Sequence, residues 1–203
     1  MKFAANKMNF EDWYCHIQYM FNTCGSNILQ HSHLDGNRLV ESTGFHLPEA
    51  KSEYMLQWSL VKGIKPESIL EIGSANGISA VMWNMLCPKV TTLSYLYYPH
   101  FDAVTKNLEF TKLTGDSLKE LPALINEKRT FDFIFIDGNH RYEFAKADFE
   151  NSLKLKPRFI LMHDTSKIAG PRTLIEELKG KYNLTKFEVG CGLTLINLTN
   201  DAI

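Results

Sequence analysis

The sequence predicts an α/β fold in which helices cover both faces of a doubly wound, mainly parallel sheet. Short apolar runs typical of buried strands alternate with longer segments whose apolar residues recur at steps of three and four. Several of these runs end in acidic or polar loops, as strands do where an open α/β sheet binds its ligands. The chain has 203 residues, which is sufficient for one such domain with a sizeable core.

The composition is that of an ordinary globular protein, with 44% hydrophobic and 22% charged residues and a formal charge of -1. This balance gives no indication of nucleic-acid binding. The first residues are followed by polar side chains, so we expect no signal peptide or membrane span and a cytosolic location by default. Reduced, mostly buried thiols are expected rather than disulfides or a zinc site, because the cysteines are widely scattered: Cys15, Cys24, Cys87 and Cys191.

The N-terminal segment, residues 1–47, is expected to hold a helix and a loop that pack on a main domain formed by residues 48–203. A helical stripe predicts the helix over residues 9–24, and it consists of Phe10, Trp13, Tyr14, Ile17, Met20 and Phe21. The next stretch carries His31, His33 and His46 among small polar residues. It is interpreted as a polar loop rather than a metal site, or as part of a lid over a substrate. A second helix is predicted over residues 48–61, with Pro48 in its first turn.

Residues 68–80 read as strand, tight loop and helix. Gly73 permits a turn with positive φ, and Gly77 lets the helix start close to the strand or to a ligand. Glu71 lies where the strand enters the loop, so a ligand with positive charge or with amine and hydroxyl donors suits this loop better than a pyrophosphate. The helix is predicted over residues 78–86, and Pro88 ends it.

The second strand is predicted over residues 90–96, but the carboxylate that such a strand often presents to a ribose is absent. Ser94 stands near that position, and Asp102 is an alternative that could reach back from the following segment. A short helical piece over residues 100–107 precedes a third strand at 109–113. Asp116 or Ser117 then caps a further helix.

A continuous apolar run over residues 131–136 predicts a central strand that ends in Asp137, with His140 in the loop behind it. A helix follows from residue 142. The next buried strand, residues 158–165, ends in His163 and Asp164. Because the carboxyl ends of parallel strands share one edge, we expect these side chains to lie in the same crevice as Glu71.

After a helix that Gly170 and Pro171 open, residues 186–189 and 193–198 read as a terminal antiparallel hairpin. The predicted sheet therefore has seven strands. A dinucleotide oxidoreductase would more often continue with parallel units, so this hairpin argues against that class of enzyme.

The motif Glu71-x-Gly73-x-x-x-Gly77, together with Ile-Asp-Gly-Asn-His-x-Tyr-Glu at 136–143 and His-Asp-Thr at 163–165, resembles class I S-adenosylmethionine-dependent methyltransferases. The resemblance is to methyltransferase family 24, with its sugar O-methyltransferase and cephalosporin-hydroxylase-like relatives, and it spans about residues 48–198. It implies a Rossmann-like fold.

The resemblance also implies roles for individual residues. The S-adenosylmethionine-binding residues are expected to be Glu71, Gly73, Ser74, Ala75, Asn76, Gly77, Ser94, Asp116, Ser117 and Asp137. His140 is the expected general base, because an imidazole has a pKa near neutral, and Asp137 is the alternative. Metal assistance is left open, and a site for the metal is expected at Asp137, His163 and Asp164 where the reaction uses one. It would hold Mg²⁺ or, because of the imidazole, a softer divalent ion.

The predicted function is methylation of a hydroxyl on a small molecule or sugar. The rivals are a catalytically silent S-adenosylmethionine-binding protein and a nucleotide-dependent oxidoreductase or hydroxylase. No motif in the sequence identifies the methyl acceptor. The sequence also does not decide between a monomer and a homodimer.

Overall fold

The computed structural model describes residues 9–24, 31–35, 38–42, 47–98, 101–106 and 108–199, with side chains at 9–17 and in the ranges from 51 onward. Its main sheet has seven strands in the order β5-β4-β3-β6-β7-β9-β8. The strands are β3 Ile69–Ile72, β4 Val90–Ser94, β5 Thr111–Thr114, β6 Phe133–Ile136, β7 Phe159–His163, β8 Asn183–Phe187 and β9 Leu193–Asn197. Only β9 runs against its neighbours, so the predicted Rossmann-like sheet with a C-terminal antiparallel hairpin is confirmed.

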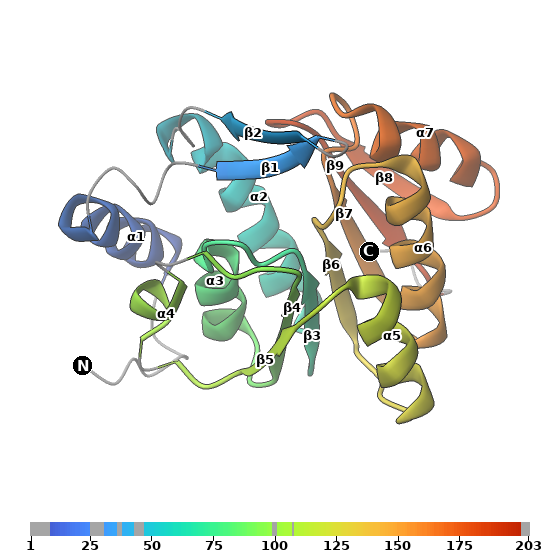
Figure 1. Cartoon of the computed structure of the whole chain (residues 1–203), viewed down its shortest axis with the longest axis horizontal. Helices are drawn as coiled ribbons and strands as arrows, with labels where there is room; N and C mark the ends of the chain where they lie inside the picture. The colour runs from blue at the N-terminus through green and yellow to red at the C-terminus, as the bar shows by residue number, and fades with distance from the viewer. Residues whose placement is uncertain are drawn as a thin grey trace.

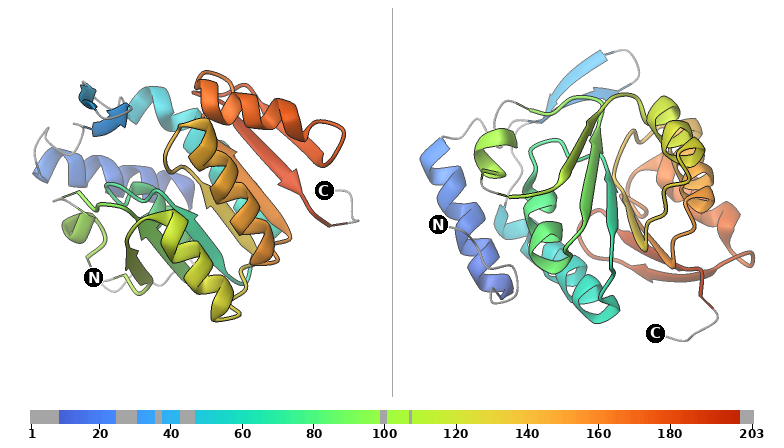
Figure 2. Two further views of the ribbon diagram at one scale, coloured as in Figure 1. Left: turned by 45° about the vertical axis from the view of Figure 1, so that its right-hand side comes forward. Right: turned by 90° about the horizontal axis from the view of Figure 1, so that it is seen from below.

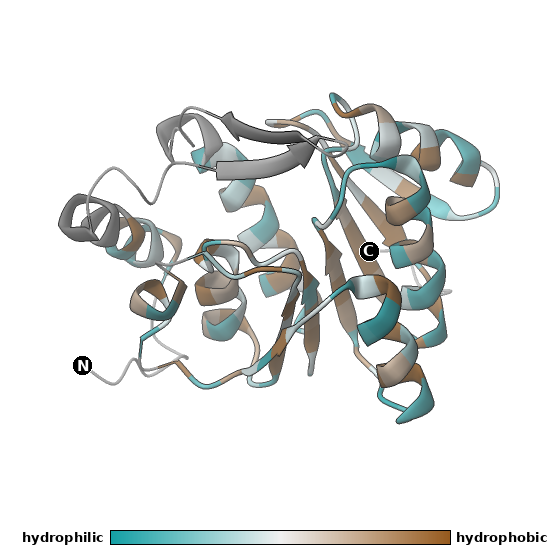
Figure 3. Ribbon diagram, in the orientation of Figure 1, coloured by the Kyte–Doolittle hydropathy of each residue, from teal (hydrophilic) through white to brown (hydrophobic). Residues whose placement is uncertain are grey.

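Helices cover both faces of this sheet (Figures 1 and 2). One face packs against α1 Phe10–Cys24, α2 Leu47–Ile64 and α3 Ile78–Leu86, and the other packs against α5 Ser117–Asn126, α6 Tyr142–Lys154 and α7 Ala169–Leu178. A short helix, α4 Phe101–Val104, follows β4. The hydropathy colouring shows apolar strands between helices that are polar on their outer sides (Figure 3). Within the described residues no helix is long and apolar enough to cross a membrane.

Strand alternation decides which side chains reach which helical layer. In β3, Leu70 and Ile72 lie in the core beneath α5, α6 and α7, whereas Ile69 packs on the α2 and α3 side. The same alternation directs Glu71 toward α3. In β7, Leu161 lies on the α2 and α3 side, and His163, two residues later, points the same way. Glu71 and His163 therefore lie on the face that α2 and α3 cover.

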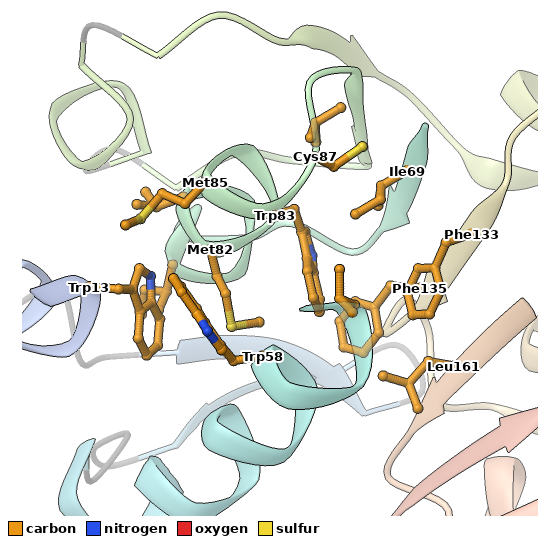
Figure 4. Packing of buried hydrophobic residues seen from close by; sticks show 14 of the residues in the cluster. Trp13, Trp58, Ile69, Met82, Trp83, Met85, Cys87, Phe133, Phe135 and Leu161 are labelled. Atoms are coloured by element: carbon orange, nitrogen blue, oxygen red, sulfur yellow. The ribbon is translucent and has the colours of Figure 1, made fainter. Parts of the chain in front are cut away.

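The core beneath α1, α2 and α3 is built around three tryptophans (Figure 4). Trp13 of α1 is fully buried, and its ring centroid lies 6.4 Å from that of Trp58 on α2. Trp83 of α3 is also fully buried, and it packs against Phe135 of β6 at 5.2 Å. The N-terminal helix thus packs on the same layer that supports the sheet.

Several observed elements differ from the predicted ones. β4 ends at Ser94 because Ser94 Oγ donates to the Leu96 carbonyl and Tyr97 Oη donates to the carbonyls of Thr92 and Leu113, which turns the chain out of the sheet. The third strand begins at residue 111 instead of 109, and the predicted helical piece at 100–107 is helical only over α4. β8 is shifted toward the N-terminus, to residues 183–187.

The segment interpreted as a polar loop contains a two-stranded antiparallel hairpin, β1 His31–Asp35 paired with β2 Arg38–Ser42. It lies beside the start of α2 at the top of Figure 1. The expectation of a loop is therefore wrong for His31 and His33, and His46 lies outside the described residues.

The expectation of mostly buried thiols is also wrong for the described cysteines. All three are free as expected, but only Cys87 is buried, while Cys191 is half-buried and Cys15 is exposed. Cys24 has no described side chain.

Candidate functional site at the carboxyl edge of the sheet

The loop between β3 and α3 needs both of its glycines. Gly73 has φ +100°, and a Cβ there would lie 1.9 Å from the carbonyl oxygen of Asp137. Gly77 has φ +81°, and a Cβ there would lie 2.8 Å from the side chains of Phe101 and Thr105. The predicted positive-φ turn is confirmed. The close approach at Gly73 also joins this loop to the loop that follows β6.

Glu71 is fully buried, and its carboxylate is bonded by side chains of α3 and of the loop that follows β3. Trp83 Nε1 donates to Glu71 Oε1 at 2.8 Å, and Ser74 Oγ donates to Oε2. Burial raises the pKa of Glu71 to about 7, although hydrogen bonds from Ser79 and Trp83 partly oppose this shift. The carboxylate thus fixes the start of the loop onto α3 and is directed toward that helix.

Four titratable side chains meet where β6 and β7 end, as predicted. His140 Nε2 lies 2.8 Å from Asp164 Oδ2 and 3.5 Å from Asp137 Oδ1. His163 Nδ1 lies 3.1 Å from Asp137 Oδ1 and 3.3 Å from Asp164 Oδ2. Asp164 adopts a positive φ of 61°, a strained conformation for a non-glycine residue. Two carboxylates are thus shared by two imidazoles.

The two carboxylates change the titration of both histidines. Burial alone would lower the pKa of His140, but the hydrogen bonds and charges of Asp137 and Asp164 raise it to about 10. Burial would likewise lower the pKa of His163, and the surrounding carboxylates hold it well above its ordinary value. The expectation that the pKa of His140 lies near neutral is therefore wrong for the protein alone, in which this imidazole is protonated at pH 7.

Glu53 of α2 belongs to this cluster, although the sequence did not predict it. Its Oε1 pairs with His163 Nε2, and its Oε2 accepts a hydrogen bond from the Cys191 amide at 3.1 Å. Only 10% of its side chain is exposed. A signal was present in the sequence, since Glu53 and Gln57 place two polar residues on one face of a helix that is otherwise rich in apolar residues.

The cluster has the donors of a divalent-cation site. Ligand atoms of Asp137, His163 and Asp164 all lie within 4.8 Å of one another. Moreover, His163 Nδ1 is buried and has no aligned hydrogen-bond partner among the described residues, although it faces two carboxylates. A bound cation would take the place of the proton that this nitrogen carries between the two carboxylates in the protein alone. One nitrogen and two carboxylates suit Mn²⁺, Fe²⁺, Co²⁺ or Zn²⁺ better than they suit Mg²⁺.

The remaining predicted residues lie around the β3–α3 loop and the neighbouring strand ends. Asp116 caps α5 by accepting a hydrogen bond from the Leu118 amide at 3.0 Å, and Ser117 is the first residue of that helix. Ser94 is engaged with the Leu96 carbonyl, and Asp102 is paired with Lys112 on β5 at 2.8 Å. Ser74 and Asn76 are buried, and Ala75 has φ +41°.

Comparisons with known proteins agree with this architecture. Residues 70–165 match the model of a family described as a methyltransferase domain. Among solved structures, an O-methyltransferase from Bacillus cereus in complex with SAH has a TM-score of 0.64 and 21% identity, and the match covers 90% of each chain.

Two further O-methyltransferase or methyltransferase structures are similar. TomG from Streptomyces achromogenes, solved with SAM, has a TM-score of 0.59 and 21% identity over 74% of this chain and 81% of its own. MycE of the mycinamycin biosynthetic pathway, solved with Mg, SAH and mycinamycin VI, has a TM-score of 0.53 and 15% identity over 73% of this chain and 48% of its own. At these identities the structures show the shared fold. A sequence search of curated proteins finds no match.

Proposed function

We propose, from the premise that residues 70–165 of this chain form a methyltransferase domain, that the protein transfers a methyl group from S-adenosylmethionine to a hydroxyl of a small molecule or sugar. The observation that carries the proposal is the gathering of Asp137, His140, His163 and Asp164 at the carboxyl edge of the sheet. These residues are joined to the glycine loop of β3 by the contact between Gly73 and Asp137. Open α/β sheets bind ligands at this edge.

The cofactor is assigned to the 73–77 loop and to the neighbouring strand ends. In this assignment Glu71 acts by fixing the loop onto α3, whereas Asp116 and Ser117 flank the adenine. The ribose position at the end of β4 has no carboxylate, because Ser94 stands there and its hydroxyl donates to the Leu96 carbonyl. The carboxylate of Asp102, the alternative, is paired with Lys112. We therefore expect weaker ribose anchoring than two carboxylate hydrogen bonds would provide.

The sulfonium of the cofactor already activates the methyl group. The protein therefore mainly has to align the acceptor oxygen with this methyl group and to remove the hydroxyl proton. A C–S bond breaks as a C–O bond forms, and the acceptor hydroxyl loses its proton. Asp137, His163 and Asp164 would hold a divalent cation, which would lower the pKa of a bound hydroxyl. His140, whose side chain is 39% exposed, is assigned to receive the proton once Asp137 and Asp164 no longer hold it as an imidazolium.

Calorimetric titration tests the cofactor assignment. We expect S-adenosylmethionine and S-adenosylhomocysteine to bind and NADH not to bind, and the reverse result would favour an oxidoreductase. A His140→Ala protein is expected to bind the cofactor as wild type does but to turn over at least tenfold more slowly. Unchanged turnover would rule out the base role.

A second candidate is a catalytically silent S-adenosylmethionine-binding protein. It is favoured by the missing carboxylate after β4 and by a His140 that is protonated in the protein alone. Tight S-adenosylhomocysteine binding without turnover on a panel of hydroxyl acceptors, with and without Mn²⁺, would support it.

A further inference from the structure

We propose that Glu53 is a positioning residue that holds His163 through Nε2, so that Nδ1 is left free to bind a divalent cation together with Asp137 and Asp164. The proposal rests on the divalent-cation part of the proposed function and is independent of the methyl acceptor. Glu53 lies in the helix before the glycine loop, more than a hundred residues from His163 in sequence.

The two ring nitrogens of His163 have different surroundings. Nε2 is bonded to the Glu53 carboxylate, which only accepts, so this nitrogen must carry a proton. Nδ1 faces Asp137 and Asp164 at 3.1 Å and 3.3 Å without an aligned hydrogen bond. When a cation displaces the Nδ1 proton, the pairing with Glu53 therefore keeps the other proton on Nε2 and leaves the Nδ1 lone pair directed between Asp137 and Asp164.

Glu53 is itself held from two sides. Its Oε2 accepts from the Cys191 amide at 3.1 Å, while Oε1 pairs with His163. The backbone of Gly190 passes so close that a Cβ at that position would lie 1.5 Å from Glu53 Oε2. The turn between β8 and β9 thus makes room for this carboxylate, and the turn binds it through a backbone amide.

With a cation bound to Nδ1, this arrangement would be a carboxylate–histidine–metal triad. In such sites the outer carboxylate orients the imidazole and raises its basicity, and its loss weakens metal binding by about 10–100-fold. A glutamine at position 53 keeps the size of the side chain and can still accept from Nε2 with its one oxygen, but it removes the negative charge and turns an NH₂ group toward the Cys191 amide. Glu53→Gln therefore tests the charge and the orientation without opening a cavity.

Mn²⁺ affinity is the first measurement, taken from the electron paramagnetic resonance signal of free Mn²⁺ with the full chain in the absence of cofactor. We expect Glu53→Gln to bind Mn²⁺ at least tenfold more weakly than wild type. The matched control is Glu11→Gln, which also removes one negative charge, from an exposed glutamate of α1 that pairs with Lys51 of α2. It should bind Mn²⁺ as wild type does. Equal affinity for wild type and Glu53→Gln would overturn the proposal.

Nuclear magnetic resonance of the wild-type protein provides a test that does not depend on the folding of a variant. With ¹⁵N-labelled histidine and Zn²⁺, long-range proton–nitrogen correlations distinguish the two ring nitrogens, and His163 is assigned by comparison with His163→Gln. We expect a protonated Nε2 and a Zn²⁺-shifted Nδ1. A Zn²⁺-shifted Nε2, or a wild-type protein that binds neither Mn²⁺ nor Zn²⁺, would overturn the proposal.

The same samples separate this inference from the proposed function. A wild-type protein that binds Mn²⁺ with the expected tautomer but shows no heat of binding with S-adenosylmethionine would refute methyl transfer and leave the role of Glu53 standing. Conversely, a protein that binds the cofactor but no divalent cation would overturn the role of Glu53 alone.

Discussion

Replacing Asp148 with asparagine should stabilise the protein at pH 8 and have little effect at pH 4. Asp148 lies on α6, where it is fully buried, and neither of its carboxylate oxygens has an aligned hydrogen-bond partner among the described residues. The Ser152 hydroxyl, one turn further along the helix, lacks a partner in the same way. Burial raises the pKa of Asp148 from an ordinary 3.8 to about 6, although the Ser117 hydroxyl partly opposes the shift.

Proton binding determines whether the free energy of unfolding rises or falls with pH. Because its pKa is raised in the folded protein, Asp148 binds a proton more tightly when the chain is folded than when it is unfolded. The free energy of unfolding therefore falls as the pH rises from about 4 to about 6, and it stays lower above that window. At 1.36 kcal/mol per pKa unit the full penalty is about 3 kcal/mol at pH 8. An asparagine side chain carries no charge, so Asp148→Asn should recover about 1–3 kcal/mol at pH 8 and only about 0.5 kcal/mol or less at pH 4.

Urea unfolding of wild type and Asp148→Asn at pH 4 and pH 8, at one ionic strength, measures this effect. The difference between the two proteins removes the contribution of other groups, such as Glu71, that titrate in the same range. Glu150→Gln is the control, because it removes an exposed carboxylate from the same helix and should change the free energy of unfolding by less than about 0.5 kcal/mol at either pH. Equal effects of Asp148→Asn at both values of pH would refute the reasoning.

Substitutions at three further positions test the fold. Gly73→Ala should destabilise the protein by about 3 kcal/mol or more, because its Cβ would overlap the Asp137 carbonyl at a positive φ, and wild-type stability in chemical unfolding would contradict this. Asp116→Ala removes the cap that accepts from the Leu118 amide and should cost about 1 kcal/mol, whereas Asp116→Asn should retain most of it. Trp13→Ala should lower the free energy of unfolding by about 3–5 kcal/mol if α1 belongs to the main folding unit, and an unchanged urea midpoint would show that it does not.

Most of the fold can be predicted from the sequence, because its signals are local. The helix predicted over residues 78–86 is α3 at its observed bounds, and the helix from Tyr142 is α6. Periodic apolar spacing and flanking prolines are sufficient for such elements. The end of β4 is not predictable in this way, because it depends on hydrogen bonds from Tyr97 to Thr92 and to Leu113 of the next strand. The hairpin at 31–42 is also missed, since its strands carry little of the apolar alternation that marks a strand.

The candidate site likewise has features that the sequence predicts and features that it does not. The gathering of Asp137, His140, His163 and Asp164 is predictable, because parallel strands end at one edge. Their electrostatics are not, since the pKa of His140 depends on having two carboxylates within 3.5 Å. Glu53 is missed for a related reason. Its partner is distant in sequence, and only the packing of α2 on the sheet brings the two residues together.

The reversed direction of β9 has a consequence for how the chain can be engineered. β8 runs with β7 and β9 runs back, so the turn between them comes to the carboxyl edge. There the carbonyl of Gly192 accepts from the Thr165 amide, and the carbonyl of Cys191 accepts from the amides of Ser166 and Lys167. Hairpin turns are usually good places for an inserted tag, a protease site or new chain ends. This turn is a poor one, because lengthening it would withdraw a backbone amide from Glu53. A permutation or reporter insertion is better placed at Gly180, where an added Cβ meets no atom within 4 Å.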